Sequence, residues 1–291
     1  MPLTFSPAVD GQVATIGSGF NMLHFNHTMF DERRMSPVVM VDHFHMSSPT
    51  FQPHPHAGMS AVTLAFQDTR GAMVSVDSTG RSSMIMPGDL HWTLAGRGIV
   101  HTQRPLASRS HIHALQIFVN LPAADKGCAP RSFLVPRSRM PTVALPNALV
   151  TVVAGNFAGV ASPAALPQPL LMLDIETLGD TPNFQVPLPG GWNATLLAIN
   201  GAVRLSGAHE LTAGCALTVR SLDDNSALEI SSIGRSHLVL LAGPQIDEPV
   251  VQQGPFVLDS AQALSESIQA YQRGDFGTVT QAEQNLARSS A

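Results

Sequence analysis

The sequence predicts an all-β protein with two β-rich halves and one helix near its C-terminus. The chain has 291 residues, of which 44% are hydrophobic and only 13% are charged. It can therefore bury the core of one large domain or two ordinary ones. Its 23 glycines and 22 prolines are spread along the whole length and divide it into many short segments. This punctuation is typical of all-β sandwiches and barrels.

Alternating and continuous apolar runs supply the predicted strands of the first half. Val38–Val41 is a continuous apolar run, which indicates a buried strand. In the segment 61–66, alternation places Val62, Leu64 and Phe66 on one face and the smaller residues on the other. A strand with the same alternation is expected over 111–119, where odd-numbered residues share a face.

A connector rich in proline and arginine, from Ala123 to Pro146, separates the halves. We therefore expect an N-terminal domain over residues 1–135 and a C-terminal domain over residues 136–291. In the second domain, Asn200-Gly201 between two short apolar runs predicts a hairpin, because Asn-Gly supplies the positive φ of a tight turn.

The helix is predicted over residues 260–273. Asp259 stands in the capping position with Gln262 three residues later, which is a capping-box relation. An apolar stripe that includes Leu264 and Ile268 follows, and Gly274 stands where a C-terminal glycine is favoured. We expect this helix to pack on a sheet.

Charge and cysteine content narrow the classes of function and location. The formal net charge is −5, and the nearest approach to a basic patch, Arg131, Arg137 and Arg139, is best explained as a solvated loop. We therefore expect no direct nucleic-acid binding and no membrane binding; the sequence has neither a signal peptide pattern nor a long apolar run. Cys128 and Cys215 form no motif, so a cytoplasmic location is predicted.

His54-Pro55-His56 is the stretch with the clearest chemical meaning. Histidines two residues apart on a strand point to the same face. Two neutral imidazoles side by side can form half of a site for iron, copper, nickel or zinc. The alternative is a polar loop whose histidines only form hydrogen bonds.

Two β-rich halves with His-x-His in the first predict a double cupin barrel, and ordered sequence blocks make the prediction specific. The most distinctive blocks are Pro53–Gly58 (PHPHAG) and Ala95–His101 (AGRGIVH). Others follow the same order at residues 39–44, 87–89, 113–122, 248–256 and 271–277. On these blocks the chain resembles the pirin family from about residue 38 to residue 277.

The resemblance implies two tandem cupin barrels, of which the N-terminal one holds a divalent metal. The family's ligands are the two histidines of His-Pro-His, a histidine after Gly-Ile-Val and a glutamate two residues beyond it. Carried over to this sequence, the ligands are His54, His56 and His101, and the fourth position is occupied by Gln103. The resemblance also implies that His113 lines the pocket, which makes Gln103 and His113 the candidate catalytic residues.

Replacement of the acidic ligand changes what the site can do. An amide oxygen at Gln103 can coordinate a metal but carries no charge, and Ser60 occupies another position that is acidic in cupins. Fe(II) is the leading ion, with nickel, copper, zinc or manganese as alternatives. Gln103 cannot take a proton from a flavonol, so another residue serves, the substrate binds already ionised, or this chemistry is lost.

Other histidines lie near the motif or in the second half. His43 and His45 share one strand face, as do His111 and His113, and each is expected to be hydrogen-bonded or exposed. The C-terminal half has no His-x-His pair, so it is expected to be a degenerate cupin without a metal.

Three functions remain open at this point. Bacterial members of the family resemble quercetin 2,3-dioxygenases, which open the flavonol ring with O₂ and release carbon monoxide; this implies a small aromatic substrate. Animal members resemble iron-binding nuclear co-regulators of transcription, which implies a regulatory protein partner. The third reading is a metal-free degenerate cupin.

Overall fold

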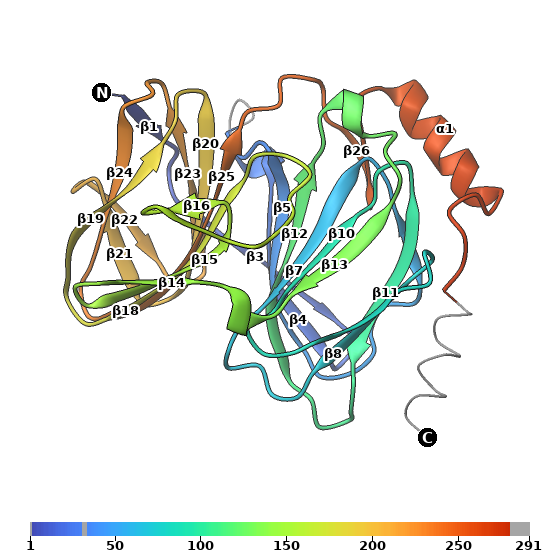
Figure 1. Ribbon diagram of the computed structural model, residues 1–291, viewed down its shortest axis with the longest axis horizontal. Coiled ribbons are helices and arrows are strands. Elements are labelled where there is room, and N and C mark those ends of the chain that lie inside the picture. Colours follow the sequence, from blue (N-terminus) through green and yellow to red (C-terminus); the bar gives the residue numbers. More distant parts are fainter. Residues whose placement is uncertain (1, 31–33, 280–291) are drawn as a thin grey trace. The chain divides into compact units, whose positions relative to one another are not determined.

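The computed structural model describes residues 2–30 and 34–279 and confirms the all-β prediction (Figure 1). Strands dominate the described chain, and an α-helix, α1 (Ala261–Gln272), follows them near the C-terminus. Short 3₁₀ helices, His27–Met29, Ala123–Asp125 and Arg137–Arg139, interrupt the strands. No helix within the described ranges is long and apolar enough to cross a membrane.

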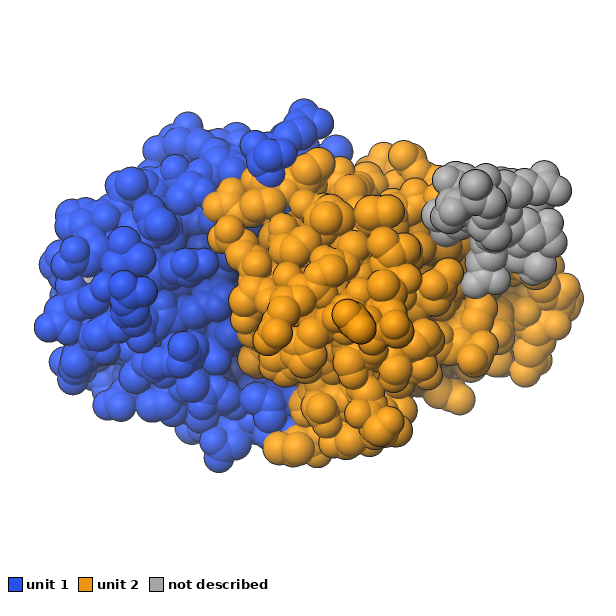
Figure 2. All heavy atoms as spheres, turned by 90° about the horizontal axis from the view of Figure 1, so that it is seen from below, with its two compact units in different colours: residues 1–12, 23–40, 138–245 blue, residues 13–22, 41–137, 246–291 orange. Residues whose placement is uncertain are grey.

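Contacts group the chain into two compact units that do not follow the linear order (Figure 2). Unit 1 comprises residues 1–12, 23–40 and 138–245. Unit 2 comprises residues 13–22, 41–137 and 246–291. The first two strands, within residues 1–12, thus belong to the unit that is formed mainly by the second half, and the C-terminal helix belongs to the unit that is formed mainly by the first half. The contact-based grouping of residues 2–12 and 246–279 differs from the expected linear division at residue 135, which stays a prediction.

Unit 2 is built around two sheets, and residues 23–26 and 38–40, which belong to two strands of the larger sheet, are grouped with unit 1. The larger sheet has the strand order β13-β10-β7-β12-β5-β4-β3, and the smaller has the order β6-β11-β8-β9. Their strands are β3 (Gln12–Ile16), β4 (Phe20–Asn26), β5 (Val38–Met46), β6 (His54–His56), β7 (Met59–Ala65), β8 (Met73–Asp77), β9 (Ser82–Ile85), β10 (Leu90–Leu94), β11 (Ile99–Pro105), β12 (Ile112–Asn120) and β13 (Arg131–Val135).

The two faces of strand β7 define the interior of this barrel. Thr63 donates a hydrogen bond of 3.1 Å to Gln103, which lies on β11 in the facing sheet. The face of the larger sheet that carries Thr63 is therefore its inner face. Because side chains alternate along a strand, Val62 and Leu64 share one face, as predicted, and the structure shows that this face is the outer one. The small side chains of the inner face leave room for polar groups inside the barrel.

The C-terminal segment of unit 2 packs on this barrel. Strands β26 (Val251–Gln253) and β27 (Phe256–Leu258) form a hairpin, and Leu264 of α1 joins an apolar cluster with Val100 and Phe256. This packing on a sheet confirms the role expected of the helix, and Gly274 has the positive φ of +85° expected at its end.

The predicted cap of this helix is wrong by one residue. Ser260, rather than Asp259, has the extended backbone of a capping residue, and its hydroxyl accepts a hydrogen bond of 3.1 Å from the Ala263 backbone N–H.

Unit 1 contains a second pair of sheets. The larger has the order β1-β23-β20-β25-β18-β15-β14, with β2 also paired to β23, and the smaller has the order β19-β24-β21-β22. Strands β16 and β17 form a separate two-stranded antiparallel hairpin. The strands are β1 (Leu3–Phe5), β2 (Val9–Asp10), β14 (Thr142–Leu145), β15 (Ala148–Ala154), β16 (Asn156–Phe157), β17 (Val160–Ala161), β18 (Leu171–Leu178), β19 (Thr181–Leu188), β20 (Trp192–Asn200), β21 (Ala202–Leu205), β22 (His209–Thr212), β23 (Cys215–Ser221), β24 (Ser226–Ser232) and β25 (Arg235–Pro244).

The hairpin predicted at Asn200-Gly201 is wrong. Strand β20 before it pairs with β23 and β25, whereas β21 after it pairs with β22 and β24 of the other sheet. Only Gly201 has a positive φ, +71°, so the dipeptide does not supply the two left-handed residues of a tight hairpin turn. It carries the chain from one sheet of unit 1 to the other.

Candidate metal centre

Three histidines of unit 2 converge inside the barrel; we call His54, His56 and His101 the inner histidine group. Each offers a ring nitrogen, and these ligand atoms lie within 4.8 Å of one another. The Nε2 atoms of His56 and His101 are 2.8 Å apart. The ring of Phe118, on the inner face of β12, packs edge-on against His56 at 5.3 Å between centroids.

Strand pairing explains how residues so distant in sequence meet. Strand β6 pairs antiparallel with β11, and the register places His101 directly opposite His54. Because β6 is an edge strand of its sheet, Pro55 can sit between the two histidines without removing a hydrogen bond from a ladder. Gly58 then turns the chain with a φ of +74°. The sequence HPH-A-G thus both supplies two imidazoles and ends the strand that holds them.

Burial keeps all three imidazoles neutral near pH 7. Desolvation lowers the pKa of His54, an effect that is opposed by its hydrogen bond to the Gln52 carbonyl. Burial lowers the pKa of His56 and His101 well below the ordinary value, and the neighbouring histidines lower it further. Neutral imidazoles present lone pairs, so this group fits a divalent cation of the borderline class. Without a cation, either His56 Nε2 or His101 Nε2 is protonated and donates a hydrogen bond to the other.

The ligand set is uncharged. Among the described residues, no carboxylate joins the inner histidine group. Gln103 lies two residues after His101 on the same strand and is largely buried. Its Oε1 accepts the hydrogen bond from Thr63, and its Nε2 lies 3.5 Å from the Ser75 hydroxyl and 3.4 Å from His91 Nδ1. The Gln103 Oε1 has a second lone pair, which can bind a cation while the first accepts the hydrogen bond from Thr63. Coordination by Gln103 stays a prediction.

Ser60 does not face the inner histidine group. It lies three residues before Thr63 on β7, so strand alternation directs its side chain to the outer face. Its hydroxyl is buried without a hydrogen-bond partner. A carboxylate at position 60 would therefore not point into the barrel, and the change that matters to the charge of the site is the one at Gln103.

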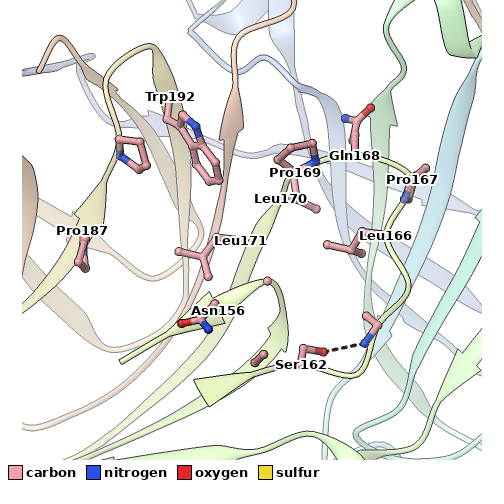
Figure 3. A pocket seen from close by; sticks show the side chains of 14 residues that line it. Asn156, Ser162, Leu166, Pro167, Gln168, Pro169, Leu170, Leu171, Pro187 and Trp192 are labelled. Atoms are coloured by element: carbon pink, nitrogen blue, oxygen red, sulfur yellow. Dashed lines mark hydrogen bonds between the residues drawn. The ribbon is translucent and has the colours of Figure 1, made fainter. Parts of the chain in front are cut away.

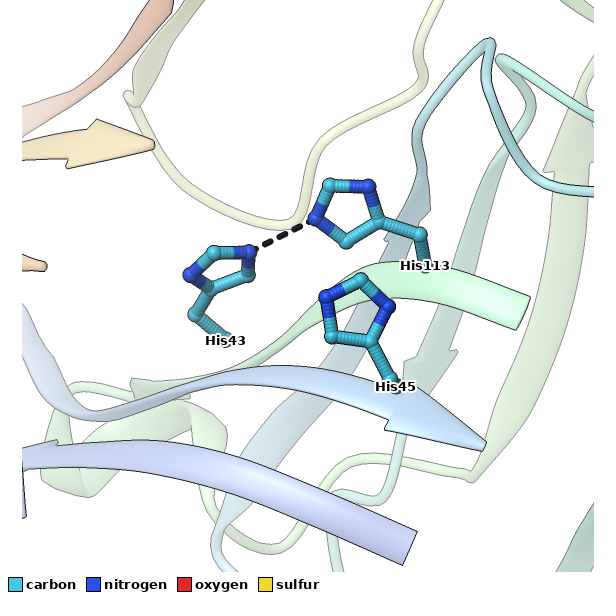
Figure 4. A group of neighbouring side chains, drawn as sticks. All are labelled: His43, His45 and His113. Atoms are coloured by element: carbon cyan, nitrogen blue, oxygen red, sulfur yellow. Dashed lines mark hydrogen bonds between the residues drawn. The ribbon is translucent and has the colours of Figure 1, made fainter. Parts of the chain in front are cut away.

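His113 lies elsewhere, in a second cluster that the sequence did not reveal. His43 and His45 of β5 and His113 of β12 form a group with ligand nitrogens within 4.8 Å of one another (Figure 4). We call it the outer histidine group. His113 is three residues from Gln116, whose side chain binds Thr63 on the inner face, so His113 faces outward. The available signal was the two His-x-His spacings, 43/45 just after a predicted strand and 111/113 on one.

Unit 1 holds a cavity, and the part of this unit that the structure describes has no comparable group of ligands. The cavity has a volume of about 730 Å³, and Figure 3 shows Trp192, Leu171 and Gln168 among its lining side chains. No histidine, cysteine or acidic residue lines it. Among the described histidines of this unit, His209 stacks on Phe5, His237 Nε2 contacts the carboxylate of Asp174, and His24 Nε2 lies 3.0 Å from Asn26 Nδ2.

Comparison with known proteins gives a consistent family. The pirin family model matches residues 14–119, and the model of the pirin C-terminal cupin domain matches residues 172–277. The chain is 32% identical over 239 residues to Pirin of Rattus norvegicus, which covers 81% of each chain. It is 30% identical over 229 residues to a Pseudomonas aeruginosa protein named provisionally as a quercetin 2,3-dioxygenase, which covers 77% of this chain and 78% of the relative.

Solved structures share the fold. A quercetin 2,3-dioxygenase from Acinetobacter baumannii matches with a TM-score of 0.83 at 23% identity, over 96% of this chain and 100% of that one. A bacterial pirin from Escherichia coli, solved in complex with nickel(II), matches with a TM-score of 0.64 at 19% identity, over 84% of this chain and 100% of that one. Both halves of the sequence match family models in the expected order, and the chain belongs to the pirin family.

Proposed function

We propose that the chain is a metal-dependent dioxygenase of flavonol-like aromatic substrates, with its metal held by His54, His56 and His101. The observation that carries the proposal is the convergence of three neutral imidazoles inside the barrel, with the Nε2 atoms of His56 and His101 2.8 Å apart. A bound ion such as Fe(II) would supply the redox and Lewis-acid chemistry that ring opening by O₂ requires. The relative from Pseudomonas aeruginosa supports the reaction class.

The neutral ligand set determines how we expect the substrate to bind. Three imidazoles and an amide leave the full +2 charge on the ion, whereas a carboxylate would reduce it to +1. An uncompensated charge in a buried site is costly, so the site favours an anionic partner. Gln103 cannot accept a proton, and its amide is held by Thr63. We therefore propose that the flavonol enters as its anion and that Gln103 contributes polar contact rather than base catalysis.

The imidazole nitrogens of His54, His56 and His101 narrow the choice of metal but do not fix it. Imidazole nitrogen suits iron, nickel, copper and zinc, and the absence of an oxygen anion from the group weakens the case for manganese. We propose Fe(II) as the working ion, with nickel as the first alternative. Elemental analysis of the purified protein, and of a His101→Ala variant, tests whether any ion is held at this site.

Activity is tested with metal-loaded protein and quercetin in air. We expect loss of the quercetin absorption band with release of carbon monoxide in equal amount, and loss of both signals in His101→Ala. Because a flavonolate is the proposed substrate, the turnover at low quercetin concentration should rise with pH until the flavonol is fully ionised. Bound metal without substrate loss or carbon monoxide would refute the dioxygenase.

The missing carboxylate also favours a second function, a metal-dependent regulator that binds a protein partner. Without a residue that can act as a base, the site could report the redox state of its metal instead of turning over a substrate. Pull-down from native cell extract with iron-loaded protein in the reduced and oxidised states tests this. A specific partner retained in one state alone supports the regulator, and no specific partner in either state refutes it.

A further inference from the structure

The outer histidine group repeats the construction of the inner one. In each group, two histidines two residues apart on one strand meet a third histidine from the adjacent strand: His54 and His56 of β6 with His101 of β11, and His43 and His45 of β5 with His113 of β12. Alternation brings the two side chains of each pair to one face, and strand pairing adds the third. Figure 4 shows the three outer rings turned toward one another.

The contacts of the outer group are those of potential metal ligands. The Nε2 atoms of His43 and His113 are 2.7 Å apart, and the ring of His45 stacks on His113 with centroids 4.2 Å apart. His45 Nδ1 is buried and has no hydrogen-bond partner. The His113 side chain is only 12% exposed, whereas both residues on β5 are half-buried. The group is therefore partly shielded from water and partly exposed to it.

A carboxylate orients His113 from behind. Asp68 places both of its oxygens 2.8 Å from His113 Nδ1. This contact fixes the proton on Nδ1 and directs the Nε2 lone pair at His43, which is the arrangement that carboxylates impose on metal-binding histidines. The backbone of His113 is also fixed, because its N–H donates to Thr69 Oγ1 and its carbonyl accepts from the same hydroxyl.

We propose that His43, His45 and His113 form a second metal site on the outer face of the larger sheet of unit 2, for a divalent first-row ion such as Zn(II). Two nitrogens that share a tetrahedral zinc lie about 3.3 Å apart, since each Zn–N bond is about 2.05 Å. The His43 and His113 nitrogens must therefore separate by about 0.6 Å, and the His45 ring must tilt out of its stack. Water, which reaches these partly exposed rings, completes the coordination.

Zinc stoichiometry of the full chain separates this site from the inner one. The protein is dialysed against Zn(II), and bound zinc is measured by elemental analysis. His45→Phe keeps an aromatic ring on His113 but removes the ligand nitrogens, and His101→Ala disables the inner group. We expect about two equivalents in the unaltered chain, about one in each variant and none in the double variant. The exposed ring of His111 has its centroid 5.2 Å from that of His45 but is not one of the proposed ligands. His111→Ala is therefore the matched control and should keep both equivalents of zinc.

The position of Asp68 allows a test that does not disturb the fold. Its side chain is 68% exposed, so Asp68→Asn should leave the far-ultraviolet circular dichroism unchanged. In the His101→Ala background, we expect this substitution to weaken zinc binding by about 10- to 100-fold. Co(II) in the same background should give the intense visible bands of a four-coordinate site. Retention of the second equivalent by His45→Phe, or a zinc content of one or fewer in the unaltered chain, would overturn the proposal.

Discussion

Replacement of Gly58 by alanine tests how strand β27 supports the segment that follows strand β6 (His54–His56). Gly58 follows His56 by two residues and has a φ of +74°. A Cβ at this position would lie 2.1 Å from the Val257 carbonyl oxygen, whereas ordinary contact begins near 3.4 Å. Strand β27 would have to withdraw by about the difference, 1.3 Å, or the loop would have to move by the same amount.

The cost of that movement can be worked from the contacts that hold β27. Val257 N donates to the Ala57 carbonyl at 3.0 Å, and the Lys126 ammonium donates to the carbonyls of Gly58 and Val257 at 2.8 and 2.9 Å. Loss of two or three such bonds costs about 2–3 kcal/mol. Left-handed backbone strain on alanine adds about 1–2 kcal/mol. We expect Gly58→Ala to lower the free energy of unfolding by about 3–5 kcal/mol.

A second glycine of unit 2 provides the matched control. Gly80 has a φ of +86°, and a Cβ there would meet no atom within 4 Å. Gly80→Ala should therefore show only the backbone strain of about 1–2 kcal/mol. Urea unfolding followed by circular dichroism measures both variants, and chelator competition measures metal affinity, which should fall in Gly58→Ala alone. Equal destabilisation of the two variants within about 0.5 kcal/mol would refute the reasoning.

Three further predictions concern the helix cap, His91 and Gln103. Ser260→Ala should destabilise the protein by about 1 kcal/mol in urea, because it removes the observed cap of α1, whereas Asp259→Ala should have a smaller effect. In metal-free protein, burial lowers the pKa of His91 from 6.5 to about 4, so the unfolded chain binds a proton that the folded chain excludes. The free energy of unfolding should then fall as pH drops from 6.5 toward 4, by up to about 3 kcal/mol more than in His91→Gln. Urea unfolding at several pH values measures this, and an equal pH dependence in the two proteins would contradict it. Gln103→Glu should tighten metal binding at least about 10-fold by chelator competition and destabilise the metal-free protein; an unchanged affinity would show that position 103 does not face the ion.

Local patterns predicted the local structure of the barrel well. The alternation of Val62 and Leu64 against smaller residues predicted the two faces of β7, and the apolar stripe predicted α1 within a residue at each end. These features follow from side-chain periodicity, which a sequence displays directly. The error at Asp259 arose because the adjacent residue, Ser260, can cap a helix equally well. The error at Asn200-Gly201 arose because the strands on either side of it pair with other, more distant strands.

The inner and outer histidine groups show why strand pairing limits prediction. Spacing alone places His43 with His45, and His54 with His56, but it says nothing about which strand lies beside them. The family resemblance supplied His101 as a partner for one pair, and its role as a ligand stays a prediction. Nothing in the sequence pairs β5 with β12, so the approach of His113 to His43, 70 residues earlier, appears only in the structure.

The two groups differ in how the charge of a bound ion would be balanced. Asp68 lies behind the outer group and can offset one positive charge, and the partial exposure of that group lets water screen the rest. The inner group is more deeply buried and has no carboxylate among its described members. An ion there carries its full charge into a low-dielectric interior, where an anionic ligand is bound most strongly. If both proposals hold, the balancing charge at the inner group has to come from a bound anion, because Gln103 is neutral. At the outer group Asp68 can supply part of that charge from the protein itself.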